Sequence, residues 1–195
     1  EDFAGMFRYS KLIEAVNDAD TSILSNITTV KMYKYFTPTL NSGLKYTLSY
    51  NNALYNPHSG HNSSGGGVIS SSGFKVNNDS SLNEHFLDDD GAGNLRLYYL
   101  SGTARVYTDA TYGTVDYATG EVVLTSAHIT SISNIDGASS TQVRVFATPS
   151  SNDIVPVRNQ VLSIDTSNST ITGEVDGIES GSSQAGTTYT TTSSY

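Results

Sequence analysis

A helical pattern of apolar residues opens the chain. Between residues 9 and 27, apolar side chains recur at intervals of three, four and seven, at Tyr9, Leu12, Ile13, Val16, Ile23, Leu24 and Ile27. This spacing predicts an amphipathic helix with one apolar stripe. Ser10 is the predicted N-cap, because its hydroxyl can accept from an unpaired N–H of the first turn. Residues 17–20 are weak helix formers, at which the helix can break in two.

The period changes to two after Asn26. Alternation over residues 27–36 and 44–50 predicts two strands, and Pro38 interrupts the ladder between them. Residues 51–67 form a polar loop, of a length that favours a functional or partner-binding segment. Short apolar runs then predict hairpins over 68–76, 85–100 and 114–124, followed by strands at 142–147, 161–164 and 170–172.

These elements predict an α+β fold in which β structure dominates. We expect the helix at 9–26 to pack on strands from 27–36 and 142–164. Residues 1–38 and 139–165 would form this small helix-plus-antiparallel-sheet unit, and residues 39–138 a β-sandwich-like insertion on it. Residues 166–195 form a Ser/Thr/Gly-rich C-terminal segment, which we expect to be ordered only by contacts with the body or another chain.

Composition narrows the functional classes. A net charge of −9 argues against a nucleic-acid partner, because it repels phosphate backbones. No apolar window is long enough to predict a membrane span. The chain contains no cysteine, which removes disulfides, thiolate zinc sites and a cysteine nucleophile.

Two clusters of side chains resemble metal ligands, but each also fits a structural role. His58 and His61 lack a local third ligand, so we favour a surface loop. Asp88, Asp89 and Asp90 begin like a calcium loop, but the twelfth position is Tyr99 instead of a bidentate glutamate. We favour an acidic hairpin turn.

Catalytic motifs are also weak. Residues 181–185 approach the Gly-x-Ser-x-Gly motif but end in alanine and lack the flanking strand and helix. The glycines at 65–67 are not followed by the Lys and Ser/Thr of a phosphate-binding loop. No carboxylate pair is singled out by the sequence. We therefore assign no catalytic, cofactor-binding or metal residue, expect no cofactor, and expect that the chain is not an enzyme.

The 13 tyrosines leave two interpretations open, amphipathic strand filling and a protein-binding surface. The cysteine-free composition with few charged residues is consistent with a structural scaffold protein. A carbohydrate-binding module or fibre adhesin domain is the alternative, although the lack of tryptophan counts against a sugar platform.

Several segments resemble a known family. Residues 7–16, 18–20 and 26–32, together with 55–61, 113–122 and 153–162, are similar to the inner-ring baseplate wedge subunit of T4-type contractile-tailed phages, within the baseplate J-like group. The resemblance spans about residues 7 to 165, and the C-terminal segment after Thr166 matches no pattern of that family.

This resemblance implies a C-terminal portion of a structural wedge protein without an active site. It implies a virion component of the viral tail baseplate, assembled in the bacterial host cytoplasm. The expected partners are copies of the chain itself, as a homodimer or ring, and other baseplate wedge subunits around the tail hub. Neither nucleic acid nor membrane is an expected partner.

Overall fold

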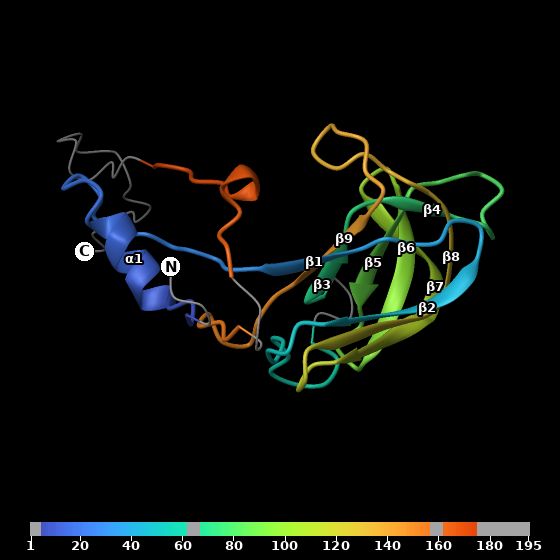
Figure 1. Ribbon diagram of the computed structural model, residues 1–195, viewed down its shortest axis with the longest axis horizontal. Helices are drawn as coiled ribbons and strands as arrows, with labels where there is room; N and C mark the ends of the chain where they lie inside the picture. Colours follow the sequence, from blue (N-terminus) through green and yellow to red (C-terminus); the bar gives the residue numbers. More distant parts are fainter. Residues whose placement is uncertain (1–4, 62–66, 157–161, 175–195) are drawn as a thin grey trace, which may run out of the picture. The chain divides into compact units, whose positions relative to one another are not determined.

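The computed structural model describes residues 5–61, 67–156 and 162–174. The chain divides into two compact units, Glu1–Leu162 and Ser163–Tyr195. The described part of the first unit holds the following elements (Figure 1): α1 Tyr9–Asn17, β1 Met32–Phe36, β2 Gly43–Ser49, β3 Ile69–Ser71, β4 Phe74–Val76, β5 His85–Asp89, β6 Asn94–Ser101, β7 Ala104–Asp116, β8 Glu121–Ile132 and β9 Val143–Ala147. The described part of the second unit contains the short 3-10 helix η1, Thr166–Asn168.

The strands form two antiparallel sheets. One has three strands in the order β1-β9-β3, and the other has six in the order β2-β8-β4-β5-β6-β7. Because β7 also pairs with β8, the strands β8, β4, β5, β6 and β7 close into a ring, and β2 adds to β8 outside that ring. The curved strands of this ring can be followed in Figure 1.

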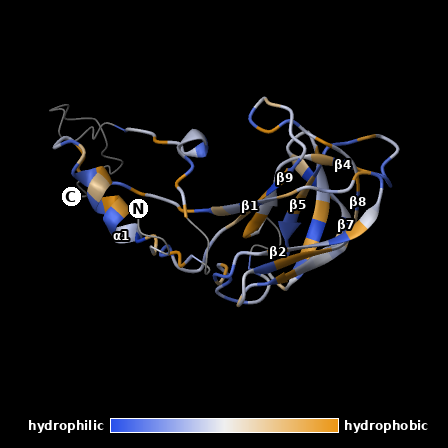
Figure 2. Cartoon of the chain, viewed as in Figure 1, coloured by the Kyte–Doolittle hydropathy of each residue, from blue (hydrophilic) through white to orange (hydrophobic). Residues whose placement is uncertain are grey.

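Both sheets contribute to one hydrophobic core. Phe74, Leu87, Leu124 and Ile129 from the six-stranded sheet and Val145 from β9 are all fully buried. Figure 2 shows apolar and hydrophilic residues alternating along several of these strands, as expected when each strand has one face in the core. The predicted α+β, β-dominant fold is confirmed. The predicted domain boundaries at 38, 138 and 165 stay a prediction.

The helix is shorter than the pattern predicts. α1 ends at Asn17, where the weak helix formers begin, and the part of the prediction over residues 18–27 is wrong because that segment is not helical. The chain returns along α1 instead. The Asn26 side-chain amide donates to Asn17 Oδ1 at 2.6 Å and to the Ile13 carbonyl at 3.4 Å, so it satisfies groups at the helix C-terminus.

The predicted N-cap is also wrong. Arg8 occupies the N-cap position without a side-chain cap bond, and Ser10 lies inside the helix. The carboxylate of Asp153 accepts from the Tyr9 backbone N–H at 2.8 Å, so a residue far away in the sequence caps the helix. A bridge between Phe7 and Ile154 fixes the same approach of the two segments.

Two of the three predicted hairpins are confirmed, β5–β6 and β7–β8. The hairpin over 68–76 is wrong, because β3 pairs with β9 whereas β4 pairs with β5 and β8. The turn at residues 72–73 carries the chain from one sheet to the other, where Ser72 N–H donates to the Arg144 carbonyl.

Of the remaining strand predictions, some are confirmed and some are wrong. The predicted strand at 44–50 is confirmed as β2 and that at 142–147 as β9, whereas the strand over 27–36 begins only at Met32. Residues 162–165 and 170–172 form no strand. Residues 157–161 and 175–195 lie outside the described residues, so the expected ordering of the C-terminal segment stays a prediction.

Candidate interaction surface

The acidic residues Asp88, Asp89 and Asp90, at the end of β5, form hydrogen bonds and ion pairs within the fold. Asp88 is buried, and its two carboxylate oxygens bind Arg96 Nε at 2.9 Å and Arg105 Nη1 at 2.7 Å. The hydroxyl of Tyr107 donates to the same carboxylate at 2.8 Å. Burial raises the pKa of Tyr107, and this bond to Asp88 raises it further. Asp88 is therefore held as a paired anion within the sheet.

Asp89 and Asp90 have other partners. Asp89 accepts from Ile69 N–H at 2.8 Å and from the Tyr117 hydroxyl at 2.6 Å. Asp90 accepts from the backbone of Ala92 and from both the backbone and side chain of Asn94. Burial would raise the pKa of Asp90, but these hydrogen bonds lower it below the usual value. The three carboxylates thus point to separate partners, as the hairpin-turn interpretation predicts for Asp90, and they do not converge on one ion.

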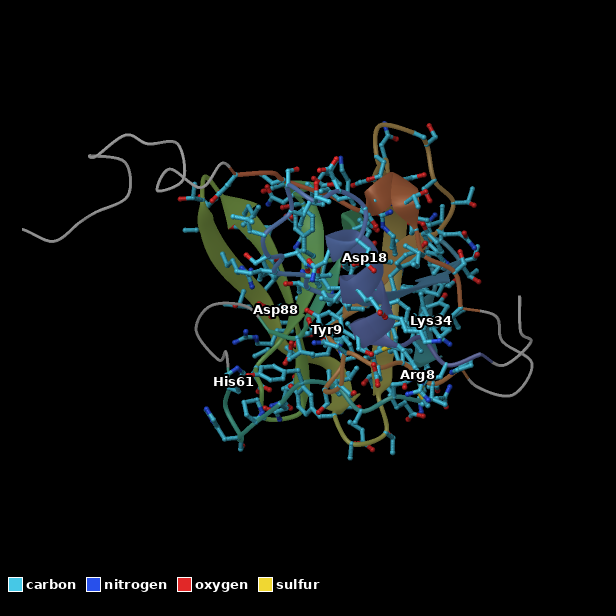
Figure 3. The ribbon with its side chains drawn as sticks, turned by 90° about the vertical axis from the view of Figure 1, so that its left-hand side faces the viewer. Arg8, Tyr9, Asp18, Lys34, His61 and Asp88 are labelled. Atoms are coloured by element: carbon cyan, nitrogen blue, oxygen red, sulfur yellow. The ribbon has the colours of Figure 1, made fainter. Side chains whose placement is uncertain are left out.

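The two loop histidines do lie together. His61 Nδ1 is 3.3 Å from His58 Nε2, and the His61 ring packs edge-on against Tyr55. The loop is fixed to the β5–β6 turn, because Asn56 donates to the Gly91 carbonyl at 3.1 Å. Figure 3 labels His61 and the buried Asp88 at separate positions. Among the residues that the structure describes, no group of three or more His, Asp or Glu side chains is placed to hold a metal ion.

Other sequence motifs contribute no assembled site. Residues 181–185, 65 and 66 lie outside the described residues, and Gly67 packs against the Asp89 side chain. The predicted strand-filling role is confirmed for some tyrosines, and the protein-binding role stays a prediction. Tyr50 and Tyr98 are buried in the sheets, whereas Tyr35 and Tyr55 are exposed.

The N-terminal segment carries apolar side chains that the first unit leaves open to water. No residue of α1 is fully buried, although the helix has a marked apolar stripe (Figure 2). Ile27 is fully exposed, Leu24 three residues before it is largely exposed, and Met6 ahead of α1 is partly exposed. Exposing a large aliphatic side chain to water is unfavourable in free energy. A contiguous group of such side chains on a protein surface indicates an interaction site.

The charges of α1 lie away from its apolar stripe. Lys11, Glu14 and Asp18 fall on the opposite face of the helical wheel from Leu12, Ile13 and Val16. Figure 3 shows Arg8 and Asp18 at opposite ends of α1. The helix therefore has basic residues near its N-terminus and an acidic residue at its C-terminus. These charges interact unfavourably with the helix dipole, so they do not stabilise the isolated helix.

Sequence reasoning missed two features of this surface. The interval between Ile23 and Ile27 fits a helix and predicts Ile27 in the apolar stripe, and nothing in the pattern indicates that Ile27 is exposed. Asp153 was not recognised as the helix cap, since a cap supplied from another part of the chain leaves no local motif.

Comparisons with known proteins point to the same segment. Residues 1–35 match a family model described as baseplate structural protein gp6, C-terminal domain III. No curated protein and no solved structure matches the chain. The match covers the exposed apolar surface and α1, and it supports a structural role in a phage baseplate. None of the helices in the described residues has the length and apolar content needed to cross a membrane.

Proposed function

We propose that this chain is a wedge framework subunit of a phage tail baseplate, which joins copies of itself and other wedge proteins around the tail hub. The observation that carries the proposal is the family match over residues 1–35, which coincides with an amphipathic helix that has no buried residue. The proposed location is the tail baseplate of the virion, with assembly in the host cytoplasm. The proposed role is structural, without catalysis.

The N-terminal segment is the surface that we assign to self-association. Burying an exposed isoleucine or leucine contributes about 1.5–3 kcal/mol, so Ile27 and Leu24 together offer a substantial driving force. Ile27 and Leu24 lie on a segment next to α1 in the sequence. In a two-fold dimer the same segment of each copy would pack against that of the other copy. Because both copies carry the same apolar side chains, this self-association requires no other protein.

Sedimentation of the whole chain tests this assignment. Ile27→Asp places a charge in the proposed interface and should shift the chain toward monomer, because a buried unpaired carboxylate is strongly unfavourable. Ile171→Asp is the matched control, since Ile171 is equally open to water but lies in the second unit. That control should keep the wild-type mass.

Circular dichroism of both variants checks that the fold is retained. If Ile27→Asp and Ile171→Asp give the same distribution as the wild type, the N-terminal segment is not the self-association surface.

A further inference from the structure

Two ring nitrogens of the loop histidines are spaced like the ligands of a tetrahedral metal ion. The distance of 3.3 Å between His61 Nδ1 and His58 Nε2 is longer than the usual N–H hydrogen bond, which spans about 2.7–3.2 Å. Two nitrogens that each lie about 2.0–2.1 Å from one tetrahedral ion are about 3.3–3.4 Å apart. At the angle of about 90° found on a square-planar ion they would be about 2.8–3.0 Å apart. The distance between the two histidines therefore matches tetrahedral Zn²⁺ better than square-planar Cu²⁺.

The tautomer of His58 makes the required lone pair available. Its Nδ1 is 3.2 Å from the Ser59 carbonyl oxygen, which can only accept, so Nδ1 carries the proton. Nε2 then holds the lone pair with which a neutral imidazole binds a metal ion. Histidine ligands of metals almost always donate their other ring N–H to a carboxylate, a backbone carbonyl or water, which fixes the orientation of the ring. His58 already has such a bond.

The backbone and an aromatic ring hold the two imidazoles in place. The His61 backbone N–H donates to the His58 carbonyl at 3.1 Å, so one tight turn sets the separation of the two residues. The Gly60 N–H donates to the Gly91 carbonyl at 3.0 Å, which fixes this turn to the connection between β5 and β6. The Tyr55 ring packs edge-on against the His61 ring, with the ring centroids 5.3 Å apart. The pair is therefore arranged before an ion binds, which reduces the ordering cost of binding.

The chemistry of the ligands selects the class of ion. Imidazole suits Zn²⁺, Cu²⁺ and Ni²⁺, whereas Mg²⁺ and Ca²⁺ prefer oxygen ligands. His58 is exposed and His61 is partly exposed, so water reaches the positions of the ion that the two rings leave open. No third His, Asp or Glu completes the set within the described residues, which predicts a site weaker than a four-ligand zinc site.

We propose that His58 Nε2 and His61 Nδ1 bind one Zn²⁺ ion per chain, with water at its other two positions. In the bound form the His61 ring carries its proton at Nε2, because Nδ1 must offer its lone pair to the ion. This site is additional to the baseplate role and does not depend on it.

Isothermal titration calorimetry of the whole chain with ZnCl₂ tests the proposal, at about pH 7.5 because metal binding needs neutral imidazoles. One ion per chain should bind with a dissociation constant of about 1–100 µM. His58→Gln and His61→Gln should each weaken this binding at least about tenfold, because either variant leaves a single imidazole. Neither side chain belongs to the hydrophobic core, so both variants should fold. His128→Gln is the matched control, since it removes a partly exposed histidine on β8 and should keep the wild-type affinity.

Nuclear magnetic resonance of the ¹⁵N-labelled chain identifies the ligand atoms. Zn²⁺ should move the resonances of His58 Nε2 and His61 Nδ1 much more than those of the other ring nitrogens. An excess of MgCl₂ should not displace the zinc, because Mg²⁺ prefers oxygen ligands. Equal weakening by His58→Gln and His128→Gln overturns the proposal, since zinc would then bind isolated imidazoles. So does displacement of zinc by Mg²⁺, coordination through His58 Nδ1, or the absence of saturable binding, which would leave only a hydrogen bond between the two rings.

Discussion

At the scale of single residues, the buried carboxylate of Asp88 has three side-chain partners within the sheet, Arg96, Arg105 and Tyr107. It joins Arg96 on β6 and Arg105 on β7, so one side chain ties three strands together. The guanidinium of Arg96 also stacks over the Tyr107 ring, at 4.3 Å from its centroid. Such a network stabilises the sheet only while every member is paired.

Asp88→Asn should therefore destabilise the chain by about 3 kcal/mol, because the buried guanidinium of Arg96 loses its ion pair with Asp88. Urea unfolding followed by circular dichroism measures the change. Glu121→Gln, a similar substitution at an exposed position on β8, should change the midpoint little. A loss for Asp88→Asn no larger than for Glu121→Gln would mean that the network contributes little.

The buried tyrosines predict a loss of stability at high pH. Burial raises the pKa of Tyr50, whose hydroxyl donates to the Val145 carbonyl at 2.7 Å. Above about pH 10 the unfolded chain releases this proton while the folded chain keeps it, so stability falls as pH rises. Tyr50→Phe should lower stability at pH 8 but lose less of it between about pH 10 and 11.

Unfolding titrations at several pH values give this slope. The control Tyr55→Phe changes an exposed ring and should keep the wild-type slope. An unchanged slope in Tyr50→Phe would show that this hydroxyl does not contribute to the alkaline loss.

At the scale of elements, the pairing of β7 with β8 depends on a close backbone approach. A Cβ at Gly113 would lie 1.9 Å from the Val123 carbonyl oxygen, which is too close for any side chain. Gly113→Ala should force the two strands apart and cost more than about 2 kcal/mol, because backbone atoms cannot rotate away. Gly173→Ala is the control, since nothing lies near its added Cβ.

Thermal unfolding of the two variants makes the comparison. A Gly113→Ala melting temperature equal to that of Gly173→Ala would contradict the close approach of β7 and β8.

The elements were predictable from the sequence where their determinants are local. The β5–β6 and β7–β8 hairpins follow from alternating residues and turn residues that stand next to each other. The hairpin over 68–76 failed because the choice between β9 and β4 as a partner for β3 is made by core packing, in which Ile69 and Val145 are both buried. The weak helix formers at residues 17–20 indicate the end of α1 at Asn17, whereas the cap at its N-terminus, Asp153, is set by tertiary structure.

The site was less predictable than the fold. The hairpin-turn interpretation of the acidic triplet holds for Asp90, whose carboxylate bonds the backbone two residues later, but it is wrong for Asp88, which lies in β5 and pairs with Arg96 and Arg105. Nothing in the sequence indicates the irregular pairing of β8 with β2 and β4, or of β6 with β7. Bulges shift register by a residue or more without a reliable sequence mark.

At the scale of the whole molecule, the net charge of −9 opposes association of like copies. Salt screens such repulsion beyond about 8–10 Å, whereas the apolar contact of the proposed interface is not weakened by it. The average sedimenting mass should therefore rise when NaCl is increased from about 0.05 M to about 0.5 M. A mass that falls with salt would indicate an interface held by charge pairs instead of apolar contact.

The central claim is that the chain is a structural component of a phage tail baseplate. Quantitative mass spectrometry of tails purified from phage particles that encode it tests this claim most directly, with purified heads and particle-free lysate as comparisons. The account predicts that peptides of the chain are enriched in the tail fraction, at copy numbers similar to those of other baseplate proteins. Peptides confined to the particle-free lysate would contradict it.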